Sequence, residues 1–302
     1  MGAGAIGSLF GSFLAKAGNE VTLIGRRSHM EAIRLRGLAV EGPQHHTITN
    51  LQAISDIAET EEGKFELILL TVKAYDTVQA VSAARRLMGE GAVLVSLQNG
   101  LGVEECALKF IRRKNLMRGV TSCAAILDKP GVIIQTGMGE TVVGELDGTT
   151  ATRTQRVAEV LKESRLPTRV TPNISGAVWM KTLVNAGINP FAALTGMRNG
   201  ELPMFEGLKE LMVETIEEGR RVAERLKVVL EGDPVAKMLT TAEATSENIN
   251  SMFIDVRRGK PTEIDFINGA IWHLGERAGV ATPLNMFLTY LVKARASKGL
   301  GG

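Results

Sequence analysis

Apolar runs and helical patterns alternate along the first half of the chain. Residues 21–24, 67–72 and 92–97 form short apolar runs bounded by turn residues, which is typical of buried strands. Residues 8–17 and 77–88, next to these runs, repeat apolar side chains at helical spacing. Apolar strands that alternate with helices predict an α/β fold, with a doubly wound, mostly parallel sheet and helices on both faces.

Two further β-rich runs follow in the same half. Residues 131–135 and 140–143 flank Gly137-Met138-Gly139. Glycines between strand-like runs mark turns. These residues therefore predict a hairpin appended to the sheet.

The pattern changes between Pro167 and Pro172. Prolines interrupt helices, and beyond them strand-like runs nearly vanish while helical periodicity takes over, as in residues 208–229. We therefore expect a first domain over residues 1–171 and an all-α second domain over residues 172–302.

The run Gly2-Ala3-Gly4-Ala5-Ile6-Gly7 is a complete G-x-G-x-x-G motif. It opens directly into the expected helix and strand of a dinucleotide-binding unit. The first glycine permits a tight turn, the second lets the backbone approach a pyrophosphate, and the third lets helix pack on strand. We therefore expect these six residues to bind a dinucleotide in a Rossmann-type domain; the alternative is a glycine-rich turn without a ligand.

This motif normally follows a strand, but only Met1 precedes it here. The first strand of such a sheet is its central one. We therefore expect a truncated first strand, through the choice of start codon or of the expressed segment. If nothing else fills the gap, the sheet is open at its centre and cofactor affinity should suffer.

The residues after the second expected strand are Gly25, Arg26 and Arg27. An NAD-selective site places a carboxylate there to accept a hydrogen bond from the ribose 2′-hydroxyl. Guanidinium groups pair well with phosphate, so Arg26 favours NADP, with NAD as the second choice. The alternative is that both arginines are solvated loop charges.

Composition excludes several classes of protein. The 302 residues contain 35 Lys and Arg against 33 Asp and Glu, so the net charge of +2 gives no electrostatic argument for nucleic acid or an anionic membrane. No apolar stretch approaches the roughly 20 residues of a membrane span. Cys106 and Cys123 suit a reducing, cytoplasmic location as buried structural residues. The four histidines have no partner at metal-ligand spacing, so no metal site is expected.

Polar residues recur every fourth position in one apolar segment. Lys181, Asn185 and Asn189 fall on one stripe of a helix, which carries one ammonium group and two amides. The alternative for such a stripe is a solvated polar face. The mixture of groups favours a binding or catalytic site.

Two other segments place polar residues near expected element ends. Lys73 and Asn99 each follow an expected strand, at the sheet edge where α/β folds bind ligands. Asn99-Gly100 is also an ordinary turn sequence. Glu263 follows Thr262, which can cap a helix in a box with Asp265, so capping alone would explain these residues.

Together these segments resemble the ketopantoate reductase (2-dehydropantoate 2-reductase) family over nearly the whole chain. The Lys-x3-Asn-x3-Asn-Pro run and Thr262-Glu263-Ile264-Asp265 are the most specific parts, and the glycine motif is the least specific. The matching segments are residues 2–7, 71–73, 98–100, 179–190, 198–202, 251–252 and 262–269.

The resemblance implies NADPH-dependent reduction of 2-dehydropantoate to pantoate, on the route to pantothenate and coenzyme A. It implies that Lys181 is the catalytic lysine and that Glu263 lies beside it near the nicotinamide. By the same resemblance, Asn185, Asn189, Asn199 and Ser251 bind substrate, and Lys73, Asn99 and Ala124 line the cofactor.

Charge then suggests how reduction proceeds. Hydride delivery to a keto carbon creates an alkoxide, which an adjacent ammonium group stabilises and protonates. Lys181 is the only cation of the stripe, so it is the expected general acid. Two alternatives stay open, a reductase of another branched 2-oxo acid and a catalytically silent NAD(P)-binding sensor. The C-terminal helices suit a homodimer surface or core packing equally.

Overall fold

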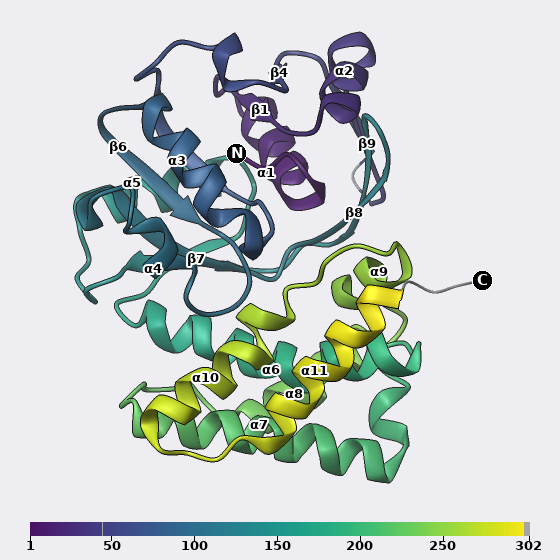
Figure 1. Cartoon of the computed structure of the whole chain (residues 1–302). Coiled ribbons are helices and arrows are strands. Elements are labelled where there is room, and N and C mark those ends of the chain that lie inside the picture. Colours follow the sequence, from purple (N-terminus) through teal and green to yellow (C-terminus); the bar gives the residue numbers. More distant parts are fainter. Residues whose placement is uncertain (44, 299–302) are drawn as a thin grey trace. The chain divides into compact units, whose positions relative to one another are not determined.

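A computed structural model describes residues 1–43 and 45–298 (Figure 1). The chain divides into two compact units. The first contains Met1–Gln98 and Val103–Ile174, and the second contains Asn99–Gly102 and the chain from Ser175 onward. None of the helices in the described ranges has the length and apolar character needed to cross a membrane.

The first unit combines strands with helices on both sides. Its helices are α1 (Ala5–Lys16), α2 (Arg27–Arg36), α3 (Thr77–Leu87), α4 (Val103–Ala107) and α5 (Thr152–Glu163), with short 3₁₀ turns η1 (Ile57–Glu59), η2 (Ala74–Asp76) and η3 (Arg113–Asn115). Its strands are β1 (Thr22–Ile24), β2 (Leu38–Glu41), β3 (His46–Ile48), β4 (Gln52–Ile54), β5 (Phe65–Leu70), β6 (Met88–Ser96), β7 (Leu116–Thr121), β8 (Ala124–Lys129), β9 (Val132–Gly137), β10 (Thr141–Glu145) and β11 (Thr168–Val170).

The strands form three sheets. The largest has the order β11-β10-β7-β6-β5, in which only the β10–β7 pair is antiparallel. A parallel pair, β1-β4, stands apart from it, and β3-β2-β9-β8 forms a third sheet. β1 and β5 are therefore not paired, and β5 is the edge strand of the large sheet. Met1 lies beside β5, where its amine donates to Leu69 O over 2.9 Å and its carbonyl accepts from Thr71 N over 2.9 Å.

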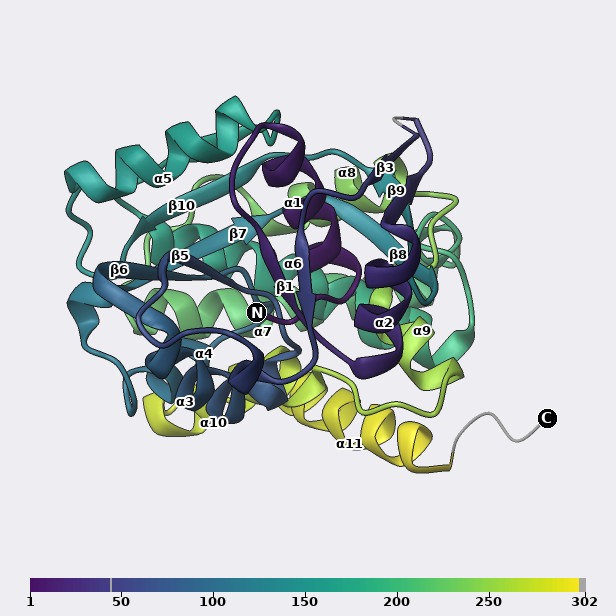
Figure 2. The same ribbon diagram turned by 90° about the horizontal axis from the view of Figure 1, so that it is seen from above.

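Alternating side chains of the large sheet enter two different cores. Ile68, Leu70 and Leu94 pack with α3 and α4, whereas Val93 and Val95 pack with α1 and α5. Figure 2 shows α3 and α5 on opposite faces of this sheet. Successive strand residues point to opposite faces, so these apolar runs are buried on both sides. The predicted doubly wound α/β class is confirmed.

The predicted hairpin around Gly137-Met138-Gly139 is wrong. β9 pairs with β8 and β2, whereas β10 belongs to the large sheet. The glycines carry the chain from one sheet to the other instead of folding it back. The actual hairpin is β8–β9, and its first strand was not expected because Ala124–Lys129 ends in the polar residues Asp128 and Lys129.

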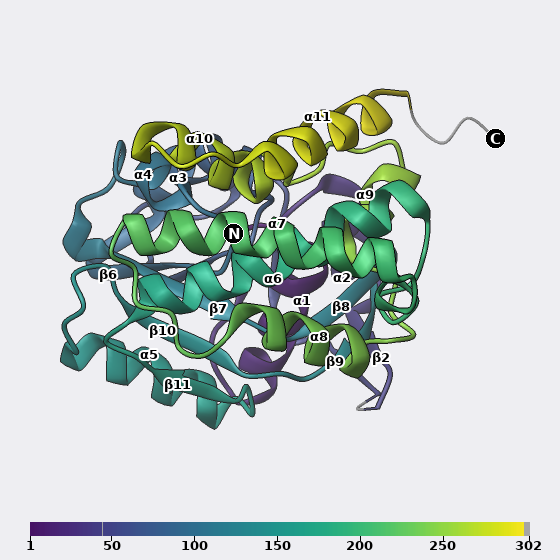
Figure 3. The same ribbon diagram turned by 90° about the horizontal axis from the view of Figure 1, so that it is seen from below.

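The second unit is helical, as predicted. Its elements are α6 (Ile174–Thr195), η4 (Leu202–Met204), α7 (Glu206–Arg225), α8 (Pro234–Ala244), α9 (Ser251–Arg257), η5 (Ile264–Phe266), α10 (Asn268–Ala278) and α11 (Pro283–Lys298). α7 contacts α8, α10 and α11, which Figure 3 shows along its length. Its buried apolar stripe, which includes Met212, Ile216 and Val222, supplies this contact face.

Candidate functional site

The glycine turn is closed tightly by the chain itself. Gly2 has a φ of +95°, and a Cβ atom there would lie 2.4 Å from Val72 N. A Cβ atom on Gly7 would lie 2.4 Å from Gly2 O and 2.5 Å from Thr71 Oγ1. The Thr71 hydroxyl donates to Gly2 O over 2.9 Å. Packing therefore requires both glycines, and Thr71 fastens the turn to the end of β5.

Gly4 differs from its neighbours because the chain does not crowd it. The nearest atom to a Cβ placed there is Gly2 O, at 4.0 Å. Gly4 is also the N-cap of α1, and no side chain makes a capping hydrogen bond there. The first N–H groups of a helix and its dipole attract anions. The open side of Gly4 and this helix end thus fit a closely approaching pyrophosphate.

Arg26 stands beside this turn, at the end of β1. Gly2 N and Ala3 N both donate to Ile24 O over 2.9 Å, which ties the glycine turn to β1. Arg26 is exposed and its guanidinium has no ion-pair partner in the described part of the chain, whereas Arg27 pairs with Glu31 over 2.8 Å. Of the two arginines, Arg26 is the one available to a ribose phosphate.

Buried Gln98 positions the loop that carries Lys73. Its Nε2 donates to Val72 O over 3.1 Å, to Lys73 O over 3.3 Å and to Thr77 Oγ1 over 2.8 Å. Arg118, only 1% exposed, donates to Gln98 O over 2.8 Å. Gln98 and Thr71 belong to the segments 98–100 and 71–73 noted from the sequence, whereas Arg118 is a residue that sequence reasoning missed. Arg118 could not be recognised from the sequence, because only the structure shows that this arginine of β7 is buried.

Ala124 opens β8, opposite Gly137 of β9. A Cβ atom on Gly137 would lie 3.4 Å from that of Ala124, so small residues occupy both positions of this pair. Ala124 is half-buried.

In the second unit, α6 carries the polar stripe. Lys181 and Asn185 are half-buried, and Asn189 is only 7% exposed. The side-chain amides of Asn185 and Asn189 make no hydrogen bond to any other residue that the structure describes. Both amides therefore keep hydrogen-bonding capacity on the stripe that carries Lys181. This arrangement fits a site for a polar ligand.

A proline fixes the helix at this stripe. Pro190 lies inside α6 and has no N–H group, so it cannot bond the carbonyl of Ala186 four residues earlier. Asn268 Nδ2 donates to that carbonyl instead, over 3.2 Å. Asn268 is thus a positioning residue that sequence reasoning missed, although it follows the Thr262–Asp265 segment.

Glu263 occupies the N-cap position of η5, but its side chain makes no capping hydrogen bond. It is 5% exposed, and its carboxylate accepts a hydrogen bond from Asn99 Nδ2 over 3.1 Å. Asp265, the other half of the expected capping box, pairs with Lys293 over 3.0 Å. Asn99 reaches Glu263 because Leu101 N donates to Phe266 O over 2.8 Å. The structure thus joins two predicted site residues that lie 164 positions apart.

Asn199 and Ser251 lie near each other through Asn250. Asn199 is buried; its Nδ2 donates to Thr245 Oγ1 over 2.9 Å, and its Oδ1 accepts from Asn250 Nδ2 over 3.3 Å. Asn250 caps α9, whose first residue is the exposed Ser251. Most of the bonding capacity of Asn199 is used within the chain, whereas the Ser251 side chain faces solvent.

Of the histidines and cysteines, His29 and Cys123 are buried, whereas Cys106 is half-buried, so the expected burial of both cysteines holds only for Cys123. His29 is buried, accepts from Gly131 N over 2.9 Å and bonds Ser8 Oγ over 3.0 Å. Cys106 and Cys123 are free thiols. The described ranges contain no group of three or more His, Cys, Asp or Glu side chains suited to a metal ion.

Comparison with known proteins identifies relatives of the whole chain. The family model "Ketopantoate reductase PanE/ApbA" matches residues 1–148, and its C-terminal counterpart matches residues 173–296. The 2-dehydropantoate 2-reductase of Pyrococcus horikoshii is 40% identical over 302 residues, which cover 100% of this chain and 98% of that protein. The Archaeoglobus fulgidus enzyme of the same name is 36% identical over 97% of this chain and 95% of its own.

Solved structures agree with these relatives. A ketopantoate reductase of Ralstonia eutropha JMP134 has a TM-score of 0.91 at 30% identity and covers 99% of this chain and 98% of its own. D-mandelate dehydrogenase, in a structure with NADH and anilino(oxo)acetate, has a TM-score of 0.91 at 29% identity, covering 98% and 97%. Full-length matches in sequence and fold show that this chain belongs to the ketopantoate reductase family of oxidoreductases.

Proposed function

We propose that the protein reduces 2-dehydropantoate to pantoate with NADPH, a step of pantothenate and coenzyme A synthesis. The observation that carries the proposal is the α6 stripe, where a lysine accompanies two amides, Asn185 half-buried and Asn189 buried, that bond no other residue the structure describes. Its relatives are named 2-dehydropantoate 2-reductases, and the residues that the family resemblance assigns to catalysis are all present. The substrate is a small 2-oxo acid, which amides and one ammonium group bind without excess charge.

The first unit has residues that fit the cofactor. The residues that would hold it are Gly2, Ala3, Gly4, Ala5, Ile6 and Gly7 at the pyrophosphate, Arg26 at the 2′-phosphate, and Lys73, Asn99, Ala124 and Glu263 toward the nicotinamide. The fit rests on the open side of Gly4 and the uncapped start of α1. When bound, a nicotinamide cofactor supplies the hydride.

Lys181 is the proposed general acid. Its ammonium group stabilises the negative charge that develops on the keto oxygen and gives that oxygen a proton. The amides of Asn185 and Asn189 hold the hydroxyl and carboxylate groups of the substrate. Glu263, fixed by Asn99, orients the ammonium group, and Asn199 and Ser251 complete the substrate site.

The test replaces Lys181 by alanine. We expect kcat for 2-dehydropantoate to fall by about 100-fold or more, because the acid and its charge are lost. NADPH binding, measured by fluorescence titration, should stay within about twofold of the wild-type protein. The control is Lys209→Ala, since Lys209 is an exposed residue of α7.

Unchanged kcat in Lys181→Ala would remove this residue from the mechanism. Tight NADPH binding by the wild-type protein without NADPH oxidation would instead support the silent sensor. A panel of branched 2-oxo acids tests the substrate, and the highest kcat/KM should belong to 2-dehydropantoate.

Cofactor choice depends on Arg26. Arg26→Ala should raise KM for NADPH about tenfold and leave KM for NADH nearly unchanged, because only NADPH carries a 2′-phosphate. Arg27→Ala is the matched control, since Arg27 pairs with Glu31 within α2. Equal effects of Arg26→Ala on both cofactors would show that this residue does not contact the 2′-phosphate.

A further inference from the structure

His29 is a buried titratable side chain to which the proposed mechanism gives no role. It lies in the first turn of α2 and is 3% exposed. Its Nδ1 accepts a hydrogen bond from Gly131 N over 2.9 Å, in the turn between β8 and β9. Its Nε2 lies 3.0 Å from Oγ of Ser8, a fully buried residue of α1. The imidazole ring therefore joins α2 to α1 and to the β8–β9 turn.

The neighbouring backbone determines the tautomer of this ring. Gly131 N can only donate, so Nδ1 carries no hydrogen and the neutral ring holds its hydrogen on Nε2. The ring therefore donates from Nε2 to the Ser8 hydroxyl. Burial lowers the pKa of His29, because desolvation disfavours the charged form. The ring is thus neutral at pH 7, and both hydrogen bonds are present there.

The two helix starts that this ring joins are the two proposed phosphate sites. Gly4 is the N-cap of α1, and its carbonyl accepts from Ser8 N over 2.9 Å. Arg26 is the N-cap of α2, and its carbonyl accepts from His29 N over 3.0 Å. The Ser8–His29 bond thus completes a continuous chain of hydrogen bonds from Gly4 to Arg26.

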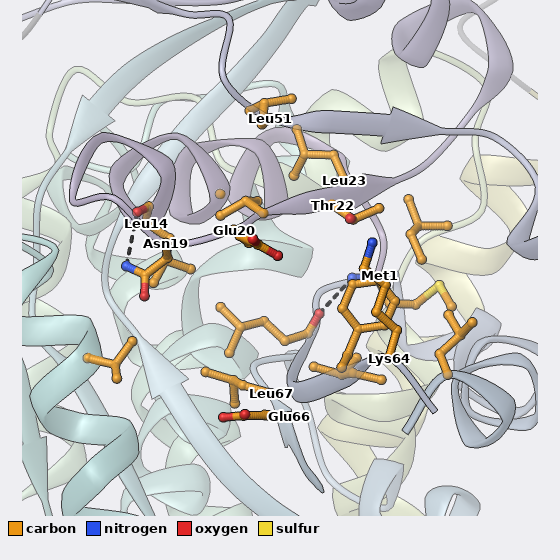
Figure 4. A pocket seen from close by; sticks show the side chains of 18 of the residues that line it. Met1, Leu14, Asn19, Glu20, Thr22, Leu23, Leu51, Lys64, Glu66 and Leu67 are labelled. Carbon is orange, nitrogen blue, oxygen red and sulfur yellow. Dashed lines mark hydrogen bonds between the residues drawn. The ribbon is translucent and has the colours of Figure 1, made fainter. Parts of the chain in front are cut away.

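Other contacts fix α1 to β1 rather than to α2. A Cβ atom on Gly11 would lie 2.5 Å from Leu23 Cδ2, so the middle of the helix packs closely on β1. At the far end of the helix, Asn19 Nδ2 donates to Leu14 O over 3.0 Å (Figure 4). Among the described residues, the hydrogen bond to Ser8 is the only one that joins side chains of α1 and α2. Its removal would therefore loosen the spacing of the two helix starts and leave α1 in place on β1.

We propose that His29 is a positioning residue that sets the spacing between the start of α1 and Arg26, and thereby favours NADPH over NADH. The inference rests on the proposed cofactor site. NADPH presents two anionic groups, the pyrophosphate and the 2′-phosphate, whose separation is limited by the covalent bonds of the adenosine. Two sites bind such a ligand together only if their spacing matches it. NADH has no 2′-phosphate and needs only the start of α1, so its binding depends less on this spacing.

The experiment removes the hydroxyl group that the ring contacts. Ser8→Ala should raise Kd for NADPH about fivefold, the value of one hydrogen bond, and leave Kd for NADH within about twofold. Ser12→Ala is the matched control, because Ser12 is also buried in α1 but its hydroxyl donates to Leu9 O within the same helix. This control should change neither Kd. Fluorescence titration measures the binding of both cofactors, and circular dichroism checks that each variant is folded.

Two variants of His29 test the ring itself. A glutamine amide can reach as far as Nε2 and still donate to Ser8, whereas an asparagine amide is shorter and reaches only the position of Nδ1. His29→Gln should therefore keep Kd for NADPH within about twofold, and His29→Asn should raise it about fivefold. The reverse order would overturn the proposal, because it would make the bond to Gly131 N the important one.

The effect must also depend on Arg26. In Arg26→Ala, which lacks the partner of the 2′-phosphate, a further Ser8→Ala change should leave Kd for NADPH within about twofold. Equal weakening of NADPH and NADH binding by Ser8→Ala would show general damage to the helix and would overturn the proposal. An equal loss of NADPH affinity with and without Arg26 would do the same. If Arg26→Ala alone leaves Kd for NADPH unchanged, the cofactor assignment fails and this inference fails with it. A normal effect of Arg26→Ala beside an inert Ser8→Ala rejects only the role of His29.

Discussion

Glycines of one motif serve different purposes. Gly2 and Gly7 are required by atoms of the chain itself, which leave no room for a Cβ atom. Gly4 has open space beside it, so the protein's own packing gives no reason for glycine there. A pyrophosphate that approaches the backbone closely would explain glycine at position 4, because a side chain there would occupy the same space.

This difference predicts opposite results for two alanine substitutions. Gly7→Ala should lower the free energy of unfolding by about 1–3 kcal/mol, because the new methyl group overlaps Gly2 O and Thr71 Oγ1. Gly4→Ala should leave the unfolding free energy nearly unchanged and weaken NADPH binding about tenfold. Urea unfolding and fluorescence titration measure the two quantities. Normal NADPH affinity in Gly4→Ala would contradict the cofactor assignment.

The features of the candidate site that the sequence predicts best are motifs whose residues lie close together in the chain. The glycine motif and the α6 stripe depend on neighbours within one element, so the sequence alone reveals them. Gln98 and Arg118 act on partners in other strands, and the Asn99–Glu263 bond joins distant segments. Such contacts depend on which strands become neighbours, and no local pattern contains that information.

At the scale of elements, the first turn of α11 donates hydrogen bonds to a buried carboxylate of another helix. The carboxylate of Glu218, on α7, accepts from Leu284 N over 2.9 Å and from Asn285 N over 3.0 Å. It also accepts from Asn285 Nδ2 over 2.8 Å. The N–H groups of Leu284 and Asn285 lie in the first turn of α11 and have no partner within that helix, so a residue of α7 accepts their hydrogen bonds.

Glu218→Ala should therefore destabilise the helical unit by about 3 kcal/mol, because the backbone N–H groups of Leu284 and Asn285 lose their acceptor. The side-chain amide of Asn285 then keeps only Thr215 O and Asn268 as partners among the described residues. Glu214→Ala is the control, since Glu214 is exposed and pairs with Arg221 on the surface; it should cost less than about 1 kcal/mol. Urea unfolding followed by circular dichroism gives both values. Equal losses in the two variants would show that the cap contributes nothing specific.

Long apolar strands, periodic helices and the short strand β1 were predictable as elements, whereas β2, β3 and β4 were not. β5 and β6 and helices α3 and α7 lie within a few residues of their expected positions. β2, β3 and β4 have three or four residues each and include polar ones, so their pairing partners define them. The expected hairpin failed for the same reason, because local glycines do not tell which sheet the next strand joins.

At the scale of the whole molecule, buried bases couple stability to pH. Burial lowers the pKa of the Met1 amine from 8.0 to about 5 and also lowers the pKa of His29. The unfolded chain therefore binds more protons than the folded one below pH 8. The contribution of these two groups to stability is therefore greatest above pH 8 and declines as the pH falls.

We expect the free energy of unfolding to fall by up to about 1.4 kcal/mol per pH unit between pH 8 and pH 5 from the amine alone. Urea unfolding at several pH values measures this slope. Acetylation of the Met1 amine removes its charge and should flatten the slope over this range, while His29→Gln should flatten only the part below about pH 6.5. An acetylated protein with the slope of the free amine would contradict the assignment.

Two expectations about the whole chain stay predictions. The expected boundary at residue 171 differs from the compact units by the segment Asn99–Gly102, which belongs with the helices. A homodimer through the C-terminal helices is the other; Phe287 and Tyr290 of α11 are exposed in the single chain.

The passage of residues 99–102 through the helical unit has a practical consequence. The polypeptide crosses between its two parts three times, after residues 98, 102 and 174. A gene fragment that starts at Ser175 would omit the turn at Gly100, whose φ of +86° lets it sit against Phe266, and would strip Glu263 of its Asn99 donor. Expressing the helical unit by itself thus calls for a circularly permuted or peptide-supplemented design, since no single cut of the gene releases it whole.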